Sequence, residues 1–417
     1  MSVLKIAGGV PLGGRISVHG SKNSVLPILA ACLIHPGETI IHNCPKLSDV
    51  NSAVKILRAL GAKIKREEST IIVDASVVNC CNVEECLMRE MRSSVIFLGA
   101  ILARCGYATI SYPGGCELGP RPIDLHLSAL KNMGVEITEG GGKIVCRANR
   151  LYGCDINLFF PSVGATENIM LAAICAEGKT RILNAAREPE IEDLQNFLCA
   201  LGAKVNGAGS SMIEIEGIKK TFDSEHTVIP DRIVAATYLS AVVIAGGDVL
   251  VENIVPSHIR TICEKLGECG ALIDTGKDYI RIMRRGALYP MRTISTMPYP
   301  GFPTDMQAPL MAVATQCDGR TFFEENIFEN RYRHVQELVK MGADIKAEGK
   351  AALVNGGRYL NGAHVFARDL RGGAAVVLAG LCACGETVVS DIYHIDRGYE
   401  CIEKCLSDIG AQIAREV

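Results

Sequence analysis

One sequence pattern occurs six times, and this repetition constrains the fold more than any other feature. In each copy, a helix-forming stretch rich in Leu and Met ends in a glycine, and a short strand-like segment follows. These glycines recur about every 70 residues, which is a period typical of repeated structural units. They are Gly61, Gly134, Gly202, Gly270, Gly342 and Gly410. Because six copies account for the chain, we expect a fold assembled from one repeated α/β unit.

A second pattern has the same period and predicts a buried helix in every copy. It consists of an apolar stretch, a glycine and a strand, as in VLPILAACLIHPGETI and AVVLAGLCACGETVV. A helix that is apolar nearly all round is buried on every side. The other helix of each copy is amphipathic, since Val50, Val54 and Leu57 recur at helical spacing. Each unit is therefore predicted to contain an apolar helix, a strand, an amphipathic helix and two further strands.

The last copy predicts how the chain ends are arranged. It stops at IAREV, one strand short, and we expect the N-terminal segment LKIAGG to supply that strand. Both ends would then belong to one domain. Six units divide into two lobes of three, with crossovers near residues 21 and 229. The predicted lobes are residues 22–229 and residues 1–21 with 230–417, with the active site in the cleft between them.

Composition excludes some classes of function. A net charge of -3 does not indicate a nucleic acid or an anionic membrane as a partner. The N-terminus has no secretory signal, and no run approaches the length of a membrane span, so we expect a cytoplasmic protein. The 18 cysteines are then expected as reduced thiols. Three clusters, at 80–86, 382–384 and 401–405, lack the paired spacing of a zinc site, which predicts buried structural thiols and no metal. No oligomeric state is predicted.

Polar residues occur at one register, about 15 residues before each strand-leading glycine, where the buried helices begin. This register holds Lys22, Asn23, Arg92, the stretch Ser162, Val163 and Gly164, then Asp231, Arg232, Asp305 and Arg371. Arg121, Arg331 and Arg397 lie near the starts of amphipathic helices. Helix caps and solvated charges are one explanation. An arginine at a helix N-terminus opposes the helix dipole, however, so we favour a shared anionic ligand.

The loop PGGCELGPRP carries the strongest candidate for a reactive group. Its glycines and prolines are typical of a lid that presents a side chain. Cys116 is expected to be exposed and close to Arg121, and both conditions make a thiol reactive. His126 follows the loop and is expected to be a satisfied or solvated histidine. No phosphate-binding loop, dinucleotide fingerprint or zinc-protease motif competes with this site.

Several segments together resemble UDP-N-acetylglucosamine enolpyruvyl transferase. They are SKNSVLP, PGGCELGPRPIDLHL, FPSVGATEN, PGFPTDMQAP, ENRYRHVQEL, DLRGGAA and DRGYE. The resemblance runs in order from Lys22 to Arg397. It implies the enolpyruvyl transferase fold, an inside-out α/β barrel of six βαβαββ-like repeats. It also implies transfer of the enolpyruvyl group of phosphoenolpyruvate to the 3'-hydroxyl of UDP-N-acetylglucosamine, the first committed step of peptidoglycan precursor synthesis.

The resemblance assigns roles to individual residues. Cys116 is implied to donate a proton to C3 of phosphoenolpyruvate, and Asp305 to accept the proton of the sugar hydroxyl. The residues implied to hold phosphoenolpyruvate are Lys22, Asn23, Arg121, Arg371 and Arg397. Those implied to contact the UDP-sugar are Asn23, Arg92, Arg121, Pro122, Ile123, Asp124, Leu125, Ser162, Val163, Gly164, Asp305, Ile327 and Arg331. No metal or organic cofactor is implied. Glu117, after the cysteine, departs from the small or apolar residue usual in the family.

Other functions remain open at this point. The shikimate-pathway enolpyruvyl transferase, 3-phosphoshikimate 1-carboxyvinyltransferase, shares the predicted fold and the donor, but the Cys116 loop and DLHL favour the UDP-sugar enzyme. A catalytically idle paralogue that binds UDP-sugars would be expected to lack Cys116, Asp305 or a cationic residue, and all are present. A pure scaffold would not place charges at one register of its helices.

Overall fold

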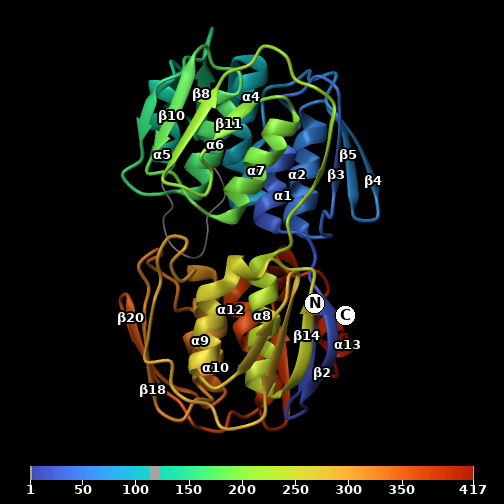
Figure 1. The fold of residues 1–417 in the computed structure, drawn as a ribbon, viewed down its shortest axis with the longest axis vertical. Helices are drawn as coiled ribbons and strands as arrows, with labels where there is room; N and C mark the ends of the chain where they lie inside the picture. The colour runs from blue at the N-terminus through green and yellow to red at the C-terminus, as the bar shows by residue number, and fades with distance from the viewer. Residues whose placement is uncertain (1, 113–122, 417) are drawn as a thin grey trace. The chain divides into compact units, whose positions relative to one another are not determined.

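A computed structural model describes residues 2–112 and 123–416, and this part of the chain divides into two compact units. Residues 2–19 and 230–416 form the terminal unit, named for the two chain ends that it contains. Residues 20–112 and 123–229 form the internal unit. In each unit, a group of helices packs together and strands run alongside it (Figure 1).

The internal unit is built around three buried helices. They are α1 (Lys22–Ala31), α4 (Phe97–Cys105) and α6 (Val163–Ala173). The amphipathic helices are α2 (Ser48–Ala59), α5 (Asp124–Asn132) and α7 (Pro189–Ala200), joined by the short helix α3 (Glu85–Glu90) and the 3-10 turn η1 (Arg92–Ile96). Its strands are β3 (Glu38–His42), β4 (Lys63–Glu67), β5 (Thr70–Asp74), β6 (Tyr107–Ser111), β7 (Glu136–Gly140), β8 (Lys143–Arg147), β9 (Asp155–Asn157), β10 (Lys179–Leu183), β11 (Lys204–Asn206), β12 (Met212–Glu216) and β13 (Ser224–Thr227).

The terminal unit follows the same plan. Its buried helices are α8 (Arg232–Ala245), α10 (Gln307–Ala314) and α12 (Leu370–Cys382), and its other helices are α9 (Arg260–Glu268), α11 (Val335–Lys340) and α13 (Ile402–Asp408). Three 3-10 turns are η2 (Pro256–Ile259), η3 (Thr304–Met306) and η4 (Ile392–Arg397). Its strands are β1 (Val3–Ala7), β2 (Leu12–Ser17), β14 (Gly247–Glu252), β15 (Leu272–Thr275), β16 (Tyr279–Arg284), β17 (Thr293–Ser295), β18 (Arg320–Glu324), β19 (Asp344–Glu348), β20 (Ala351–Asn355), β21 (His364–Phe366), β22 (Glu386–Ser390) and β23 (Gln412–Glu416).

The predicted order of elements is confirmed along the described chain, for example as α6, β10, α7, β11 and β12. The predicted role of the N-terminal segment is also confirmed, since β1 lies between β22 and β23 and pairs antiparallel with both. The described strands form three sheets in each unit. Each four-stranded sheet has two antiparallel pairs and one parallel pair, as in the order β11-β12-β10-β9.

The parallel strands show where the chain passes between the units. Elsewhere the parallel neighbour directly precedes the buried helix, as β9 precedes α6 and pairs with β10. At the crossovers the strands are exchanged: β2 precedes α1 but pairs with β14, and β13 precedes α8 but pairs with β3. The strand before each crossover therefore stays in the unit that the chain is leaving: β2 in the terminal unit and β13 in the internal unit. The sequence did not predict β2, because two adjacent glycines interrupt its alternation.

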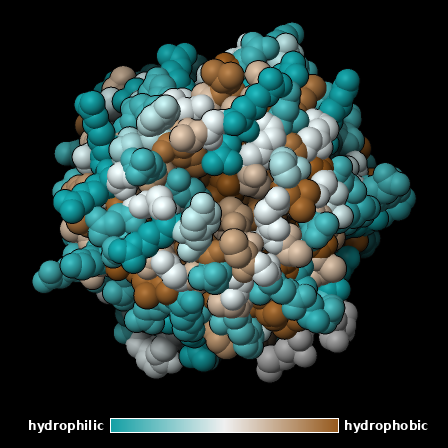
Figure 2. Space-filling model, turned by 90° about the horizontal axis from the view of Figure 1, so that it is seen from below, coloured by the Kyte–Doolittle hydropathy of each residue, from teal (hydrophilic) through white to brown (hydrophobic). Residues whose placement is uncertain are grey.

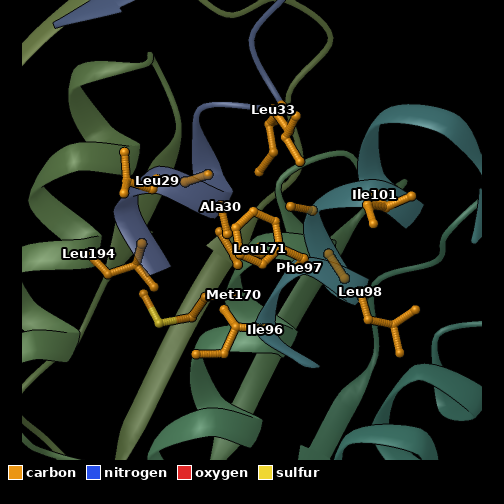
Figure 3. Packing of buried hydrophobic residues seen from close by; sticks show 14 of the residues in the cluster. Leu29, Ala30, Leu33, Ile96, Phe97, Leu98, Ile101, Met170, Leu171 and Leu194 are labelled. Atoms are coloured by element: carbon orange, nitrogen blue, oxygen red, sulfur yellow. The ribbon is translucent and has the colours of Figure 1, made fainter. Parts of the chain in front are cut away.

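The buried helices form the cores of the units, as their all-round apolar sequences predict. Every residue of α8 from Ile233 to Ile244 is buried. In the internal unit, side chains of α1, α4, α6 and α7 interleave around Phe97 and Leu171 (Figure 3). Close approach of the helices depends on Gly99 of α4, where an added Cβ would lie 2.3 Å from the carbonyl oxygen of Asn168. A larger residue there would force two helices apart.

The repeated glycines end the amphipathic helices in left-handed conformations. Gly134 has φ +91°, and Gly202 has φ +99°. Such angles favour glycine because other residues meet a steric penalty there. An aromatic ring also covers each site: an added Cβ would lie 3.1 Å from the ring of Tyr152 and 2.8 Å from that of Phe222, respectively. The period found in the sequence is therefore the period of this helix-ending turn.

The prediction of buried structural thiols is wrong for part of the cysteine clusters. Cys86, Cys384 and Cys401 are exposed. Cys382 fits the prediction better, because it lies in α12 and burial raises its pKa to about 12. The cysteines of the described ranges are free thiols. Cys384 was misjudged because a short apolar stretch does not show where its helix ends: α12 ends at Cys382, and Cys384 lies beyond the helix.

Hydrophilic side chains cover most of the face drawn in Figure 2, and hydrophobic ones show mainly near its middle. Among the helices in the described ranges, none has the length and apolar character that crossing a membrane requires.

Candidate functional site

Asp305 is the centre of the charged site in the terminal unit. It lies in η3, directly before α10. Its Oδ1 accepts a hydrogen bond from Nη2 of Arg331 at 3.0 Å. Its Oδ2 accepts from Nε and Nη2 of Arg371 at 3.1 and 2.9 Å. One carboxylate thus receives two guanidinium groups, and the Asp305 cluster, defined as these three residues, keeps one positive charge.

The two arginines of this cluster are buried, whereas the carboxylate is partly open. Both guanidinium side chains are 3% exposed, and the Asp305 side chain is 28% exposed. Burial opposes the charge of Arg371, but Asp305, Tyr399 and Asp231 together outweigh it, so the pKa of Arg371 is raised. Removing one partner of a buried pair leaves the other charge uncompensated, which costs about 3–5 kcal/mol. The geometry therefore fixes the direction of the Asp305 carboxylate.

The sequence analysis predicted an anionic ligand opposite the arginines at helix starts. Arg371 is the second residue of α12, and the structure pairs it with Asp305, 66 positions earlier in the chain. Asp305 of the same chain therefore supplies a negative charge opposite this arginine. Asp369, the N-cap of α12, accepts hydrogen bonds from the backbone N–H groups of Arg371 and Gly372 at 3.0 and 2.9 Å. It satisfies the helix end and so removes the dipole penalty on the arginine.

Glu325 supports this site and was missed by the sequence analysis. It is buried, and its carboxylate accepts hydrogen bonds from the hydroxyl of Thr304 at 2.9 and 3.0 Å. It also accepts from the backbone N–H groups of Ile327 and Phe328 at 2.9 and 3.1 Å. One buried acid thereby joins the residue before Asp305 to the loop of Ile327. Glu325 lies just after β18, where a strand ends and a loop begins, and this position could have indicated a functional residue.

In the internal unit, Lys22 begins α1 and is buried. Its Nζ lies 3.3 Å from Oδ2 of Asp49, which is in the first turn of α2. A second carboxylate holds the same first turn of α1, since Asp193 of α7 accepts a hydrogen bond from Ser24. Asp193 also binds Nε2 of His226 at 2.8 Å. Two acids on flanking helices therefore orient the start of α1.

His126 lies close to two other predicted residues of the internal unit, Arg92 and Gly164. Its Nδ1 accepts a hydrogen bond from the side-chain amide of Asn168 at 2.9 Å. Burial and the positive charge of Arg92 lower the pKa of His126 to about 4, so it is neutral at physiological pH. An added Cβ at Gly164 would lie 3.2 Å from the His126 ring. The prediction of a satisfied histidine is confirmed, and the ring brings Arg92 and the start of α6 together.

The N-terminus of α6 is the candidate anion site of this unit. Ser162 caps it by accepting a hydrogen bond from the backbone N–H of Ala165 at 3.3 Å. Val163 and Gly164 form its first turn and are half-buried. Free N–H groups and the helix dipole favour a negatively charged group at such a position. In the described ranges, no cluster of His, Cys, Asp and Glu has the geometry to hold a metal ion.

Comparison with known proteins bears on these residues. Residues 6–406 match the family described as EPSP synthase (3-phosphoshikimate 1-carboxyvinyltransferase). The chain is 51% identical over 415 residues to UDP-N-acetylglucosamine 1-carboxyvinyltransferase 2 of Caldanaerobacter subterraneus, with 100% of both chains covered. The chain belongs to the UDP-N-acetylglucosamine 1-carboxyvinyltransferase family. The fold of this carboxyvinyltransferase family member is also found in solved structures of related enzymes.

Two such structures illustrate the range of similarity. The enolpyruvyl transferase NikO from Streptomyces tendae superposes with a TM-score of 0.90 at 25% identity, covering 99% of this chain and 98% of NikO. EPSP synthase from Acinetobacter baumannii superposes with a TM-score of 0.76 at 19% identity, covering 100% of both chains. The enolpyruvyl transferase fold is therefore shown for this chain.

The remaining predicted residues of this carboxyvinyltransferase family member lie at element ends. Asn23 follows Lys22 in α1 and is half-buried, and Arg397 is the last residue of η4. Ile123, Asp124 and Leu125 lie at the start of α5 and are respectively buried, exposed and half-buried. The predicted residues Cys116, Glu117, Arg121 and Pro122 lie outside the described residues.

Proposed function

We propose that this chain transfers the enolpyruvyl group of phosphoenolpyruvate to the 3'-hydroxyl of UDP-N-acetylglucosamine and releases phosphate. The observation that carries the proposal is the difference in similarity between two relatives. The chain is 51% identical along its full length to an enzyme named for UDP-N-acetylglucosamine, but 19% identical to an EPSP synthase of the same fold. The alternative acceptor, shikimate 3-phosphate, is correspondingly less supported.

The charges of the candidate residues suit the donor. Phosphoenolpyruvate carries about three negative charges, and planar guanidinium groups fit both its carboxylate and its phosphate. We assign Lys22, Arg121 and Arg397 to these groups, with Arg371 as a further cation and Asn23 near the reacting sugar. The positive charge that the Asp305 cluster retains supports this assignment. The start of α6 and Arg92 are assigned to the UDP-sugar.

The chemistry requires an acid and a base. In the proposed first step, the Cys116 thiol gives its proton to C3 of phosphoenolpyruvate, and the sugar 3'-oxygen bonds to C2 while Asp305 takes the hydroxyl proton. This gives a tetrahedral phospho-ketal. In the second step C3 loses a proton, the C2–C3 double bond forms again, and the C2–O bond to phosphate breaks. Neither step calls for a metal or an organic cofactor.

The proposal also covers the repeats, the lobes and the cellular compartment of the enzyme. We propose that the sheets and helices form six βαβαββ-like repeats of an inside-out barrel, divided into lobes of residues 22–229 and of 1–21 with 230–417. The common strand pattern of the four-stranded sheets supports this description. We further propose that residues of both lobes act together on the substrates, and that the enzyme works in the cytoplasm on peptidoglycan precursors.

The decisive experiment measures phosphate release with both substrates present and with each omitted. Release that requires UDP-N-acetylglucosamine is expected. Release with shikimate 3-phosphate instead would replace the proposed acceptor, and binding of the UDP-sugar without turnover would indicate an idle paralogue.

The role of Cys116 is tested separately. Cys116→Ser should lose most turnover and most sensitivity to alkylation by fosfomycin, because the hydroxyl is a much weaker acid and nucleophile than the thiol. Cys116→Asp should retain part of the activity, because a carboxylic acid also supplies a proton. Kinetics of Cys116→Ser equal to those of the original protein would remove Cys116 from the mechanism.

A further inference from the structure

Tyr399 lies against the Asp305 cluster. Its side chain is 1% exposed, and the guanidinium carbon of Arg371 lies 5.4 Å from the centroid of its ring. An aromatic face at this distance attracts a cation, and the attraction is larger where water is excluded. Nη1 of Arg371 is buried and has no hydrogen-bond partner among the described residues. The electron-rich ring therefore stabilises a guanidinium whose hydrogen bonds to Asp305 use only its other two nitrogens.

The hydroxyl group of Tyr399 connects this ring to α8. Its oxygen lies 3.0 Å from Oγ1 of Thr237, and the Thr237 hydroxyl donates to the carbonyl oxygen of Ile233 at 2.8 Å. A carbonyl can only accept, so the Thr237 proton is used there and the Tyr399 hydroxyl must be the donor to Thr237. Burial raises the pKa of Tyr399, so the phenol is neutral and can donate.

The same residue also holds the segment that carries Arg397. The backbone N–H of Tyr399 donates to the carbonyl oxygen of Ile395 at 3.0 Å, which closes the end of η4. Three elements of the terminal unit thus meet at one side chain: α8 through Thr237, α12 through Arg371, and η4 through the backbone. Tyr399 lies in the segment DRGYE, to which the family resemblance assigned no role for the tyrosine.

We propose that Tyr399 is a positioning residue for the transfer reaction: it holds the guanidinium of Arg371 against Asp305 and so fixes the direction of the Asp305 carboxylate. The proposal rests on the proposed function, in which Asp305 takes the proton of the sugar hydroxyl. A displaced base misses its proton even when both substrates are bound, and small displacements can lower turnover by about 100-fold. Tyr399 does not touch the reacting atoms in this scheme.

The test compares Tyr399→Leu, Tyr399→Phe and Thr237→Val with a matched control, Tyr238→Phe. Tyr238 is an equally buried tyrosine of α8, and its hydroxyl has no hydrogen-bond partner among the described residues. Loss of that hydroxyl should therefore leave the kinetics unchanged. The measurements are kcat and KM for both substrates, the pH dependence of kcat, and thermal unfolding.

Tyr399→Leu should lower kcat by about 10- to 100-fold, with the KM for UDP-N-acetylglucosamine changed less than about threefold. The acid limb of its kcat profile should move to higher pH, because a carboxylate held less firmly by Arg371 is protonated more easily. Tyr399→Phe keeps the ring and should recover most of kcat. Thr237→Val should shift the acid limb in the same direction by a smaller amount.

Tyr399→Leu with kcat and acid limb equal to those of Tyr238→Phe would overturn the proposal. If Tyr399→Leu does not fold, Tyr399→Phe and Thr237→Val test the proposal in its place. Acid limbs of kcat in both variants that are identical to that of Tyr238→Phe would also overturn the proposal. Absence of acceptor-dependent phosphate release from the unmodified enzyme would instead refute the proposed function, so the two failures are distinguishable.

Discussion

The terminal and internal units use the same elements but prepare their charged groups differently. In the terminal unit, the arginines are already paired with a carboxylate from another helix, as Arg371 is with Asp305. In the internal unit, Nζ of Lys22 lies 3.3 Å from the carboxylate of Asp49, and Arg92 lies near a neutral histidine. One unit therefore presents a carboxylate held in one direction, and the other presents cations and a helix N-terminus.

The two units show how the same order of elements can carry opposite charges at equivalent positions. A polar residue lies at or just before the start of five of the buried helices, and Arg92 begins the 3-10 turn η1 that precedes α4. The residue type then decides the charge at that position. Asp305 and Lys22 occupy equivalent places before α10 and in α1, yet their charges are opposite. The predictions that follow test how far the two units differ.

The largest effect is expected from Asp305→Ala, which breaks the pairing of the terminal unit. Turnover should fall by more than about 100-fold because the base is lost, while substrate affinity changes less. The free energy of unfolding should fall by about 3–5 kcal/mol, because two buried guanidinium groups lose their carboxylate. Phosphate release and urea unfolding measure the two effects.

The matched control for this variant is Asp49→Asn in the internal unit. It removes the carboxylate charge 3.3 Å from Lys22 and keeps the shape of the side chain, so its loss of stability should be smaller than that of Asp305→Ala. Equal stability losses for the two variants would mean that the units do not differ in the way their charges are paired.

A change of pH is expected to have an intermediate effect on the free energy of unfolding, because each unit contains one buried histidine with a low pKa. Burial, with Arg92 nearby, lowers the pKa of His126 to about 4, and burial lowers that of His334 to about 4 although Asp369 opposes the shift. The unfolded chain binds these protons near pH 6.5, so stability is present above that pH and is lost as the pH falls towards 4. Each histidine contributes up to about 3 kcal/mol to this loss.

Urea unfolding between pH 7 and pH 4 distinguishes the two histidines. His126→Asn and His334→Asn should each make the stability less dependent on pH. At pH 7, His126→Asn should cost more, because Asn168 loses a partner, whereas the ring nitrogens of His334 have none among the described residues. A pH dependence unchanged in both variants contradicts the assignment of the acid loss to these groups.

The smallest effect is expected from the helix caps. Asp369 accepts two backbone hydrogen bonds at the start of α12, at 3.0 and 2.9 Å, whereas Ser162 accepts one at the start of α6, at 3.3 Å. Asp369→Ala should therefore cost about 1–2 kcal/mol, and Ser162→Ala about 0.5 kcal/mol. Thermal unfolding of the two variants measures the difference. The reverse order would show that α6 depends on its cap more than α12 does.

Much of the local structure could be predicted from the sequence. The buried helices follow from apolar residues on all sides, as in α8, and the ends of the amphipathic helices follow from glycines such as Gly202. The closing role of β1 followed from counting strands. By contrast, β2 was missed, and Cys384 was expected to be buried although it is exposed. Period and composition report the average environment of a stretch and not that of each residue.

Which stretches form helices and strands, and which polar residues lie near the starts of the buried helices, can be predicted from the sequence. These are local properties, set by apolar periodicity, glycine conformation and chain connectivity. Only the tertiary structure decided which side chains meet: Arg371 with Asp305, and Tyr399 with Thr237 across 162 positions of the chain. Such pairings depend on how each helix is rotated about its axis when its core packs, and that rotation is set by all neighbouring elements together.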